Sequence, residues 1–327
     1  MKPTNKDFKT ILVAGADGNL GREIINKLED NVDNRIIAVS RKITPIINRL
    51  DAVTYYTYEE LFSEHELKID IIINCAYPNK LDANEDNLRQ TQNLAQNLMQ
   101  LGIESWESSL YLNISCHCVY REYREIPVSE DRSIDGGNLD LYASHCYTTE
   151  YLLESATRSH IKLINLRLAD MIGEFYPQPL IDDMIMEAFS KKCITPRNTM
   201  NRYSFIDILD VAKAVNEIVE QKKNAFSIFN NNVYNLGYNV KSNSNSENEN
   251  SKTITTQDIA EILSNSEALR LLTGGITVDS PKNDNSNGTI NYSMDSQTLA
   301  DLLKWQPEIS FIDSIENRII ALLSPDF

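Results

Sequence analysis

The stretch from Thr10 to Ile24 reads TILVAGADGNLGREI, and the rest of the chain is interpreted from it. A short apolar run ends at Gly15, and Gly18 and Gly21 follow at three-residue intervals before a helical pattern begins. A strand, a tight turn and a helix start suit a dinucleotide pyrophosphate. Glycines let the backbone approach the phosphates, and the helix N-terminus offers free N–H groups. A second apolar run, Ile36 to Val39, follows at the distance of a βαβ unit. The alternative is an ordinary glycine-containing turn.

The residues expected to contact a dinucleotide at this turn are Gly15, Asp17, Gly18, Asn19, Leu20 and Gly21. Asp17 is also typical of a turn former. The second strand ends in Ser40 and Arg41. An acidic side chain about twenty residues beyond the glycines grips the ribose 2′-hydroxyl of NAD, whereas a basic one suits the 2′-phosphate of NADP. Arg41 therefore favours NADP, with NAD as the alternative, unless this segment is simply a solvated loop.

The composition excludes some classes of partner. The chain has 327 residues, with 31 basic against 47 acidic side chains and a net charge of −16. This balance opposes nucleic acid or an anionic membrane as a main partner, because a phosphate backbone demands a basic face. The first residues, MKPTNKDFKT, lack the apolar core of a signal peptide, and no run has the length of a membrane span. A cytoplasmic protein is the expectation.

Strands alternate with helices through the first half, which predicts an α/β layered fold. We expect an NAD(P)-binding domain over residues 1–175, which also takes 200–240, and a substrate-binding domain over most of 176–327. The stretch 241–252, KSNSNSENENSK, is too polar to bury a core and predicts a disordered insertion.

Several stretches together resemble the extended short-chain dehydrogenase/reductase family, which holds sugar-nucleotide epimerases, dehydratases and reductases. The matching stretches, in chain order, are VAGADGNLGREI, DIIINCAYP, ISCHCVY, YASHCYTTE, LRLADMIG, RYSFIDILDVAKAV, VYNLG and KWQPEISFIDSI. The resemblance covers nearly the whole chain. It implies a Rossmann-like, doubly wound parallel sheet with a smaller, mostly C-terminal α/β domain that holds a nucleotide-sugar, and hydride transfer with a nicotinamide.

The resemblance also implies a catalytic triad, in which a tyrosine exchanges the proton, a serine or threonine binds the reacting oxygen, and a lysine lowers the tyrosine pKa. Tyr142 matches the tyrosine. Cys146 stands at the lysine position, and Cys116, with Ser115 beside it, stands at the serine position. The family's dehydratases carry an acidic pair after that hydroxyl, and its absence here disfavours a dehydratase.

The missing lysine affects the free energy of forming the tyrosine phenolate. A tyrosine with an ordinary pKa is ionised at pH 7 to about one part in a thousand, so forming the phenolate costs roughly 4 kcal/mol. A neutral Cys146 cannot replace the field of an ammonium, but a protonated Tyr142 can still act as an acid toward a ketone. The first hypothesis is therefore an NAD(P)-dependent reductase or epimerase acting on a nucleotide-activated sugar. The second is a catalytically impaired, cofactor-binding homologue with a regulatory or scaffolding role.

Further site residues follow from the same resemblance. The end of the strand DIIINCA places Cys75, Ala76 and Tyr77 beside the cofactor, together with Tyr142 and Cys146. The residues expected to face the substrate are His117, Asp170 and Arg202. A carboxylate at Asp170 would repel a diphosphate. The protein could also form a homodimer, which the sequence does not decide.

The cysteines form a third line of evidence. Four of the five, Cys75, Cys116, Cys118 and Cys146, are expected near the carboxyl edge of the sheet. Thiols with nearby imidazoles suit zinc, but the intervals match no recognised zinc pattern, and Cys116 and Cys118 in an extended chain should point to opposite faces. We therefore predict no metal. A redox or metal centre remains a third hypothesis. The alternative is that the cysteines arose by sequence drift at a site that no longer needs polar groups.

Overall fold

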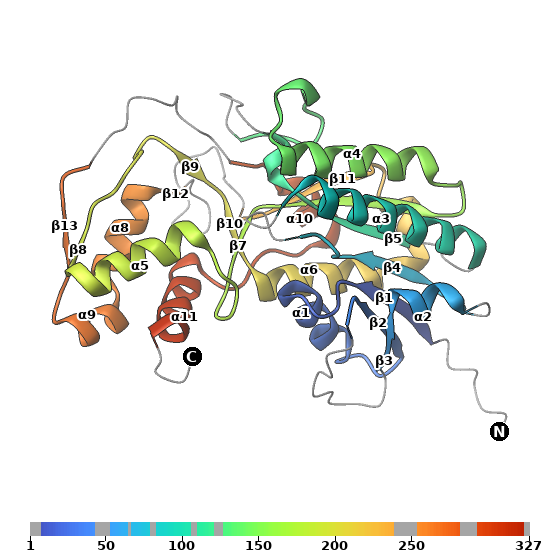
Figure 1. Cartoon of the computed structure of the whole chain (residues 1–327), viewed down its shortest axis with the longest axis horizontal. Helices are drawn as coiled ribbons and strands as arrows, with labels where there is room; N and C mark the ends of the chain where they lie inside the picture. Colours follow the sequence, from blue (N-terminus) through green and yellow to red (C-terminus); the bar gives the residue numbers. More distant parts are fainter. Residues whose placement is uncertain are drawn as a thin grey trace. The chain divides into compact units, whose positions relative to one another are not determined.

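The computed structural model describes residues 8–42, 53–64, 67–78, 83–105, 110–120, 127–238, 254–281 and 293–323 (Figure 1). The predicted insertion at 241–252 lies outside these residues. The chain divides into two compact units. The first holds Met1–Val119, Asp135–Arg167 and Ala212–Tyr234, and the second holds Tyr120–Ile134, Leu168–Val211 and Asn235–Phe327.

The first unit is built on a seven-stranded sheet with the order β11-β6-β5-β4-β1-β2-β3. Its strands are β1 (Lys9–Ala14), β2 (Asn34–Ser40), β3 (Val53–Thr57), β4 (Ile71–Asn74), β5 (Leu110–Cys116), β6 (Lys162–Leu168) and β11 (Val233–Leu236). From β3 to β5 the neighbours run parallel, and the order reverses beside β1. A reversal of strand order in a parallel sheet is the point where ligands bind. The predicted α/β fold with a doubly wound parallel sheet is confirmed.

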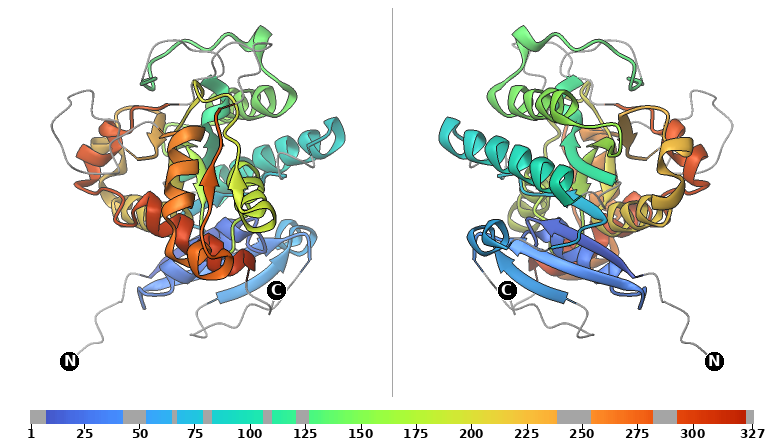
Figure 2. Two further views of the ribbon diagram at one scale, coloured as in Figure 1. Left: turned by 90° about the vertical axis from the view of Figure 1, so that its left-hand side faces the viewer. Right: turned by 90° about the vertical axis from the view of Figure 1, so that its right-hand side faces the viewer.

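Helices cover both faces of this sheet. They are α1 (Asn19–Leu28), α2 (Tyr58–Ser63), α3 (Glu85–Ser105), α4 (Leu141–Ala156), α6 (Ile208–Glu220) and α7 (Ala225–Ile228), with short 3₁₀ turns η2 (His117–Tyr120), η3 (Gly136–Asn138) and η4 (Lys222–Asn224). Helices α3 and α4 lie side by side (Figure 2). Leu98 of α3 and Leu153 of α4 share one apolar cluster with Leu12 of β1. Ile11 and Val13, equally buried, face the other side, where α1 packs, because successive strand residues alternate.

The second unit surrounds a separate core with helices and two-stranded sheets. Its helices are α5 (Pro179–Lys191), α8 (Thr256–Asn265), α9 (Glu267–Thr273), α10 (Gln297–Leu303) and α11 (Phe311–Leu323). Its strands are β7 (Asp170–Ile172), β8 (Cys193–Ile194), β9 (Arg202–Tyr203), β10 (Phe205–Asp207), β12 (Ile254–Thr255) and β13 (Thr277–Val278). Phe205 stacks on Phe311 with ring centroids 4.8 Å apart, and Ile181, Ile259 and Ile315 pack in the same cluster.

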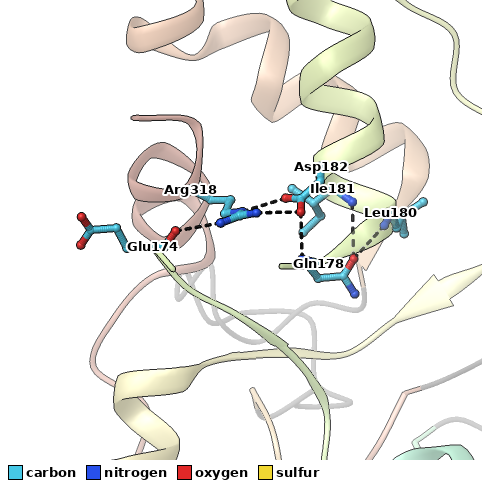
Figure 3. A network of polar contacts seen from close by, with 6 residues as sticks. All are labelled: Glu174, Gln178, Leu180, Ile181, Asp182 and Arg318. Atoms are coloured by element: carbon cyan, nitrogen blue, oxygen red, sulfur yellow. Dashed lines mark hydrogen bonds and ion pairs between the residues drawn. The ribbon is translucent and has the colours of Figure 1, made fainter. Parts of the chain in front are cut away.

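A buried arginine joins α11 to the segment that follows β7 (Figure 3). Arg318 donates from Nε and Nη2 to the two carboxylate oxygens of Asp182, each at 2.8 Å, and from Nη1 to the carbonyl of Glu174 at 2.9 Å. Gln178 caps α5 by accepting the N–H of Leu180 at 2.9 Å. The segment between β7 and α5 is thus held at both ends by polar contacts.

Candidate active site

The glycine turn after β1 needs glycine for two separate reasons. Gly15 has φ +80°, a left-handed conformation, and a Cβ there would lie 2.9 Å from the backbone carbonyl carbon of Cys75. A Cβ on Gly21 would lie 3.0 Å from the Cα of Ala16. The turn therefore packs tightly against the end of β4 and against its own helix, as a phosphate-binding turn does.

The N-terminus of α1 has no side-chain cap. Gly18 is the N-cap and supplies no side-chain cap, so the first-turn N–H groups keep no partner within the helix. Gly18 and Asn19 are exposed, whereas Leu20 and Gly21 are buried beneath them. Asp17 is half-buried in the turn. Uncapped N–H groups at the positive end of a ten-residue helix fit the pyrophosphate of a dinucleotide.

A tyrosine that the sequence analysis missed lies at this turn. Tyr58, the first residue of α2, accepts the N–H of Gly15 at its hydroxyl over 3.1 Å. Burial, followed by the carboxylate of Asp17, raises the pKa of Tyr58 to about 12, and the charge of Arg41 lowers it. Tyr58 is therefore a neutral phenol beside the turn. An aromatic residue directly after the third strand was the available signal.

The end of β2 carries the residues expected to select the cofactor. Ser40 is buried, and its hydroxyl donates to the carbonyl of Lys42. Arg41 is exposed and close enough to Tyr58 for its charge to act on that phenol. The guanidinium thus lies near the glycine turn, on the side of α2.

The end of β4 is tied to both neighbouring strands. Cys75 donates its N–H to Ala14 at 3.0 Å, and Ala76 donates to Asn74 Oδ1 at 3.2 Å. Burial raises the pKa of the Cys75 thiol to about 12. The hydroxyl of Tyr77 donates to Asn113 Oδ1 at 3.0 Å, and burial, then the nearby Cys146, raises the pKa of Tyr77 well above its ordinary value. Both groups are therefore neutral at pH 7.

A row of buried asparagines crosses the sheet under these residues. Asn74 of β4 donates to Asn113 of β5 at 3.0 Å, and Asn113 donates to Asn165 of β6 at 3.0 Å. All three side chains are almost completely buried. The row lies within the sheet directly below the ends of β4 and β5, and the sequence analysis missed it because apolar neighbours surround each member.

Ser115 and the end of β6 meet in a buried charged group. Ser115 donates to Glu150 Oε1 at 2.5 Å, and Arg167 donates to both carboxylate oxygens of Glu150, from Nε at 3.0 Å and from Nη2 at 2.5 Å. Their side chains are about 5 % exposed. The Ser115 hydroxyl therefore faces the protein interior and is occupied by Glu150.

The first turns of α4 carry the tyrosine and the cysteine singled out by sequence. Asp140 caps the helix by accepting the N–H of Ala143 at 2.8 Å. Tyr142 is half-buried, and Cys146, one turn later, is fully buried. A buried thiol thus occupies the position one turn beyond the phenol.

His145 stands beside this pair and points into the protein. Its Nε2 lies 3.0 Å from Thr91 Oγ1, and its ring meets Tyr77 edge-on with centroids 5.6 Å apart. Its Nδ1 is buried without a hydrogen-bond partner among the described residues. Burial lowers the pKa of His145 to about 4, so the imidazole is neutral.

Cys116 and Cys118 correct one expectation. Strand β5 ends at Cys116 and a 3₁₀ turn begins at His117, so the two side chains return to the same side and the structure pairs their sulfurs as a disulfide. The prediction that they face opposite ways is wrong because the chain is not extended there. Within the described part of the chain, no three His, Cys, Asp or Glu side chains gather as a metal site.

The expected substrate residues fall in different elements. His117 is buried in η2. Asp170 is half-buried at the start of β7. Burial and, to a smaller extent, the charge of Asp170 raise the pKa of Tyr176 to about 12. Asp170 also raises the pKa of Tyr203, again after burial. Arg202 is exposed on β9. In the second unit, Asp170 therefore lies beside two neutral phenols.

In the first unit, the register of β1, β4 and β5 aligns Ala14, Asn74 and Asn113. The residues that follow β1 and β4 therefore lie level at one edge of the sheet, and β5 continues three residues beyond that level. A model of the NAD-dependent epimerase/dehydratase family matches residues 11–237, and the chain belongs to this family. The predicted resemblance is thus confirmed.

Solved structures share the fold at low sequence identity. UDP-N-acetylglucosamine 4-epimerase from Bacillus cereus is 18 % identical, covers 97 % of both chains and has a TM-score of 0.72. UDP-glucuronic acid 4-epimerase from the same organism, in complex with NAD, is 19 % identical over 96 % of this chain and 98 % of its own, with a TM-score of 0.70. dTDP-glucose 4,6-dehydratase from Bacillus anthracis, in complex with NAD, is 15 % identical over 97 % of both chains, with a TM-score of 0.71.

No curated protein matches the chain by sequence. Among the described residues, the structure has no helix that is both long and apolar enough to cross a membrane.

Proposed function

We propose that this protein binds a nicotinamide dinucleotide at the glycine turn and acts as a reductase or epimerase on a nucleotide-activated sugar. The observation that carries the proposal is the turn itself. Gly15 is left-handed and packed on Cys75, and it leads into a helix whose first N–H groups have no side-chain cap. Family membership and neighbours solved with NAD support the same cofactor class.

In this proposal the residues have separate tasks. The N-terminus of α1 binds the pyrophosphate, and Ser40 and Arg41 lie on the adenosine side. When bound, the nicotinamide supplies or accepts a hydride. Tyr142, a half-buried phenol on the first turn of α4, donates a proton to the substrate oxygen. The Cys116 thiol, when reduced, is the remaining donor at the end of β5, because Glu150 occupies the Ser115 hydroxyl.

The second unit is proposed to contact the substrate through Asp170 and Arg202. Arg202 is exposed, so its guanidinium can bind a phosphate oxygen. Asp170 accepts rather than donates hydrogen bonds, so it would favour a hydroxyl or amino group over a diphosphate.

A specific observation also favours the second hypothesis, a catalytically impaired homologue. Cys146 stands at the lysine position and is fully buried, and a cysteine side chain has no cationic form. The position therefore supplies no cation to Tyr142. Such a protein would bind the cofactor but turn over slowly or not at all.

The experiment is a turnover assay on 4-keto sugar nucleotides with NADPH and with NADH. We expect Tyr142→Phe to lower kcat at least about 100-fold, the usual contribution of a positioned proton donor. Tyr151→Phe is the matched control, because Tyr151 lies on the same helix and is 65 % exposed. Cofactor binding without turnover would support the impaired homologue. Equal loss in both variants, or no cofactor binding, would refute the proposal.

A further inference from the structure

We propose that Cys116 and Cys118 form a reversible dithiol–disulfide pair that exchanges with small-molecule disulfides of the glutathione class. The first observation is their placement. The turn η2 brings both sulfurs together at the end of β5, and the structure pairs them. Two cysteines separated by one residue close this bond locally, so the rest of the first unit need not rearrange.

The two sulfurs differ in access, which assigns their roles. Cys116 is half-buried, whereas Cys118 is 3 % exposed. A small disulfide can reach Cys116 and not Cys118. Cys116 is thus the thiol that attacks first, and Cys118 is the resolving thiol.

The backbone favours the attacking form of Cys116. The N–H of Cys118 donates to Cys116 Sγ at 3.0 Å, a contact that stabilises a thiolate. The other cysteines of the first unit are less accessible or less easily ionised. Burial raises the pKa of Cys75 to about 12, and Cys146 is fully buried. The exchange is therefore selective for one site.

The exchange balances in two steps. The Cys116 thiolate attacks one sulfur of oxidised glutathione, which forms a mixed disulfide and releases one glutathione thiolate that solvent protonates. The Cys118 thiol loses its proton to solvent and attacks the Cys116 sulfur, which releases the second glutathione. Two electrons pass from the protein dithiol to the small disulfide, and one protein disulfide and two thiols result.

The consequence for the proposed function rests on that function being correct. In the reduced form Cys116 can take up a proton and donate it to a substrate oxygen, and in the disulfide it cannot. The redox state of the pair would therefore set the activity of the site.

The test follows the thiols rather than turnover. The native chain is equilibrated in buffers of varying reduced-to-oxidised glutathione ratio, quenched with acid, alkylated and digested with trypsin. The tryptic peptide 90–121 contains Cys116 and Cys118 and no other cysteine. We expect it to carry either two alkyl groups or none, with a single transition between them. Two alkyl groups at every ratio would overturn the proposal.

Single substitutions test the assigned roles. We expect Cys118→Ser to accumulate one glutathione on Cys116, because the resolving thiol is gone, and Cys116→Ser to lose the transition completely and to carry no glutathione. Cys193→Ser, on β8 of the second unit, should leave the transition unchanged. Glutathione on Cys118 in Cys116→Ser, or none on Cys116 in Cys118→Ser, would contradict the assignment. Circular dichroism confirms that each variant is folded.

These readouts need neither cofactor nor sugar. A failed turnover assay therefore leaves the exchange proposal standing, and a failed exchange leaves the proposed function standing.

Discussion

The hydroxyl of Ser115 donates to Glu150 Oε1 at 2.5 Å, in the interior of the first unit. Glu150 also accepts two N–H groups from Arg167, so a serine, a carboxylate and a guanidinium satisfy one another away from water. A hydroxyl next to the expected catalytic position thus has a structural partner. Ser115, which the sequence motif offers as a replacement for Cys116, already donates its hydrogen bond to Glu150.

This buried group predicts a large stability loss. Arg167→Met should lower the free energy of unfolding by about 3–5 kcal/mol, because it leaves the Glu150 charge buried and unpaired. Urea denaturation measures the change. The control is Arg89→Met, since Arg89 pairs with Asp86 on the surface of α3 with both side chains more than 70 % exposed. Surface pairs contribute about 0–1 kcal/mol. Similar losses in the two variants would show that burial does not set the cost.

Substitutions at two glycines with the same φ can distinguish the cost of backbone strain from the cost of close packing. Gly15 and Gly274 both have φ +80°, but a Cβ on Gly15 would meet the Cys75 backbone, whereas on Gly274 it would meet no described atom within 4 Å. Gly274→Ala should therefore cost about 1–2 kcal/mol, the usual left-handed penalty. Gly15→Ala should cost more and also abolish binding of NADH or NADPH, followed by nicotinamide fluorescence. Unchanged binding in Gly15→Ala would contradict the role of the turn.

Arg318 should stabilise the second unit. Arg318→Met breaks the bidentate pair with Asp182 and the bond to the Glu174 carbonyl, both largely buried (Figure 3). We expect a loss of about 3–5 kcal/mol and faster proteolysis between residues 173 and 178. Lys191→Met, which removes the exposed pair with Glu187 on α5, is the control and should cost less than about 0.5 kcal/mol. Equal protease sensitivity in both variants would refute the assignment.

His145 predicts a pH dependence. The pKa of His145 is about 4 in the folded protein, against 6.5 for an ordinary histidine, so between these values the unfolded chain holds a proton that the folded chain lacks. Lowering the pH from 6.5 to 4 therefore favours unfolding, by up to about 3 kcal/mol at 1.36 kcal/mol per pKa unit. As the pH falls through this window, the free energy of unfolding of wild type should decrease relative to that of His145→Gln. Parallel curves would contradict the shift.

Arg41 predicts the cofactor preference. If its guanidinium binds a 2′-phosphate, Arg41→Ala should weaken NADPH binding about tenfold or more and leave NADH binding within about twofold, since NADH lacks that group. Isothermal titration of both cofactors measures this. Arg35→Ala is the control, because Arg35 stacks over Phe8 with 4.2 Å between the guanidinium carbon and the ring centroid. Equal weakening of NADPH and NADH would indicate that Arg41 does not select the cofactor.

The sequence was sufficient for the elements whose patterns are long. The strands expected at Ile36 to Val39 and in DIIINCA match β2 (Asn34–Ser40) and β4 (Ile71–Asn74) within a few residues. Their apolar period or continuous apolar run fixes them locally. The two-residue strands β8 and β13 of the second unit were not predicted, because two residues give no period and the partner of each lies far along the chain.

The site shows the same division. The glycine turn follows from local spacing, and the structure places Gly15 and Gly18 as expected for such a turn. Tyr58 reaches Gly15 across 43 positions, a contact that no local pattern reports. The pairing of Cys116 with Cys118 depends on where β5 ends, and strand ends are the least certain part of a sequence-based prediction.

The asparagine row has an evolutionary consequence. Inside the sheet Asn74 donates to Asn113 and Asn113 donates to Asn165, so replacing the central amide by an apolar side chain removes both hydrogen bonds at once. A genetic screen that scores folding alone should reject such changes at Asn113 while accepting many at Tyr142. A screen that scores growth on the reaction product should reject changes at both positions. Comparing the two screens therefore distinguishes residues needed for folding from residues needed for the reaction.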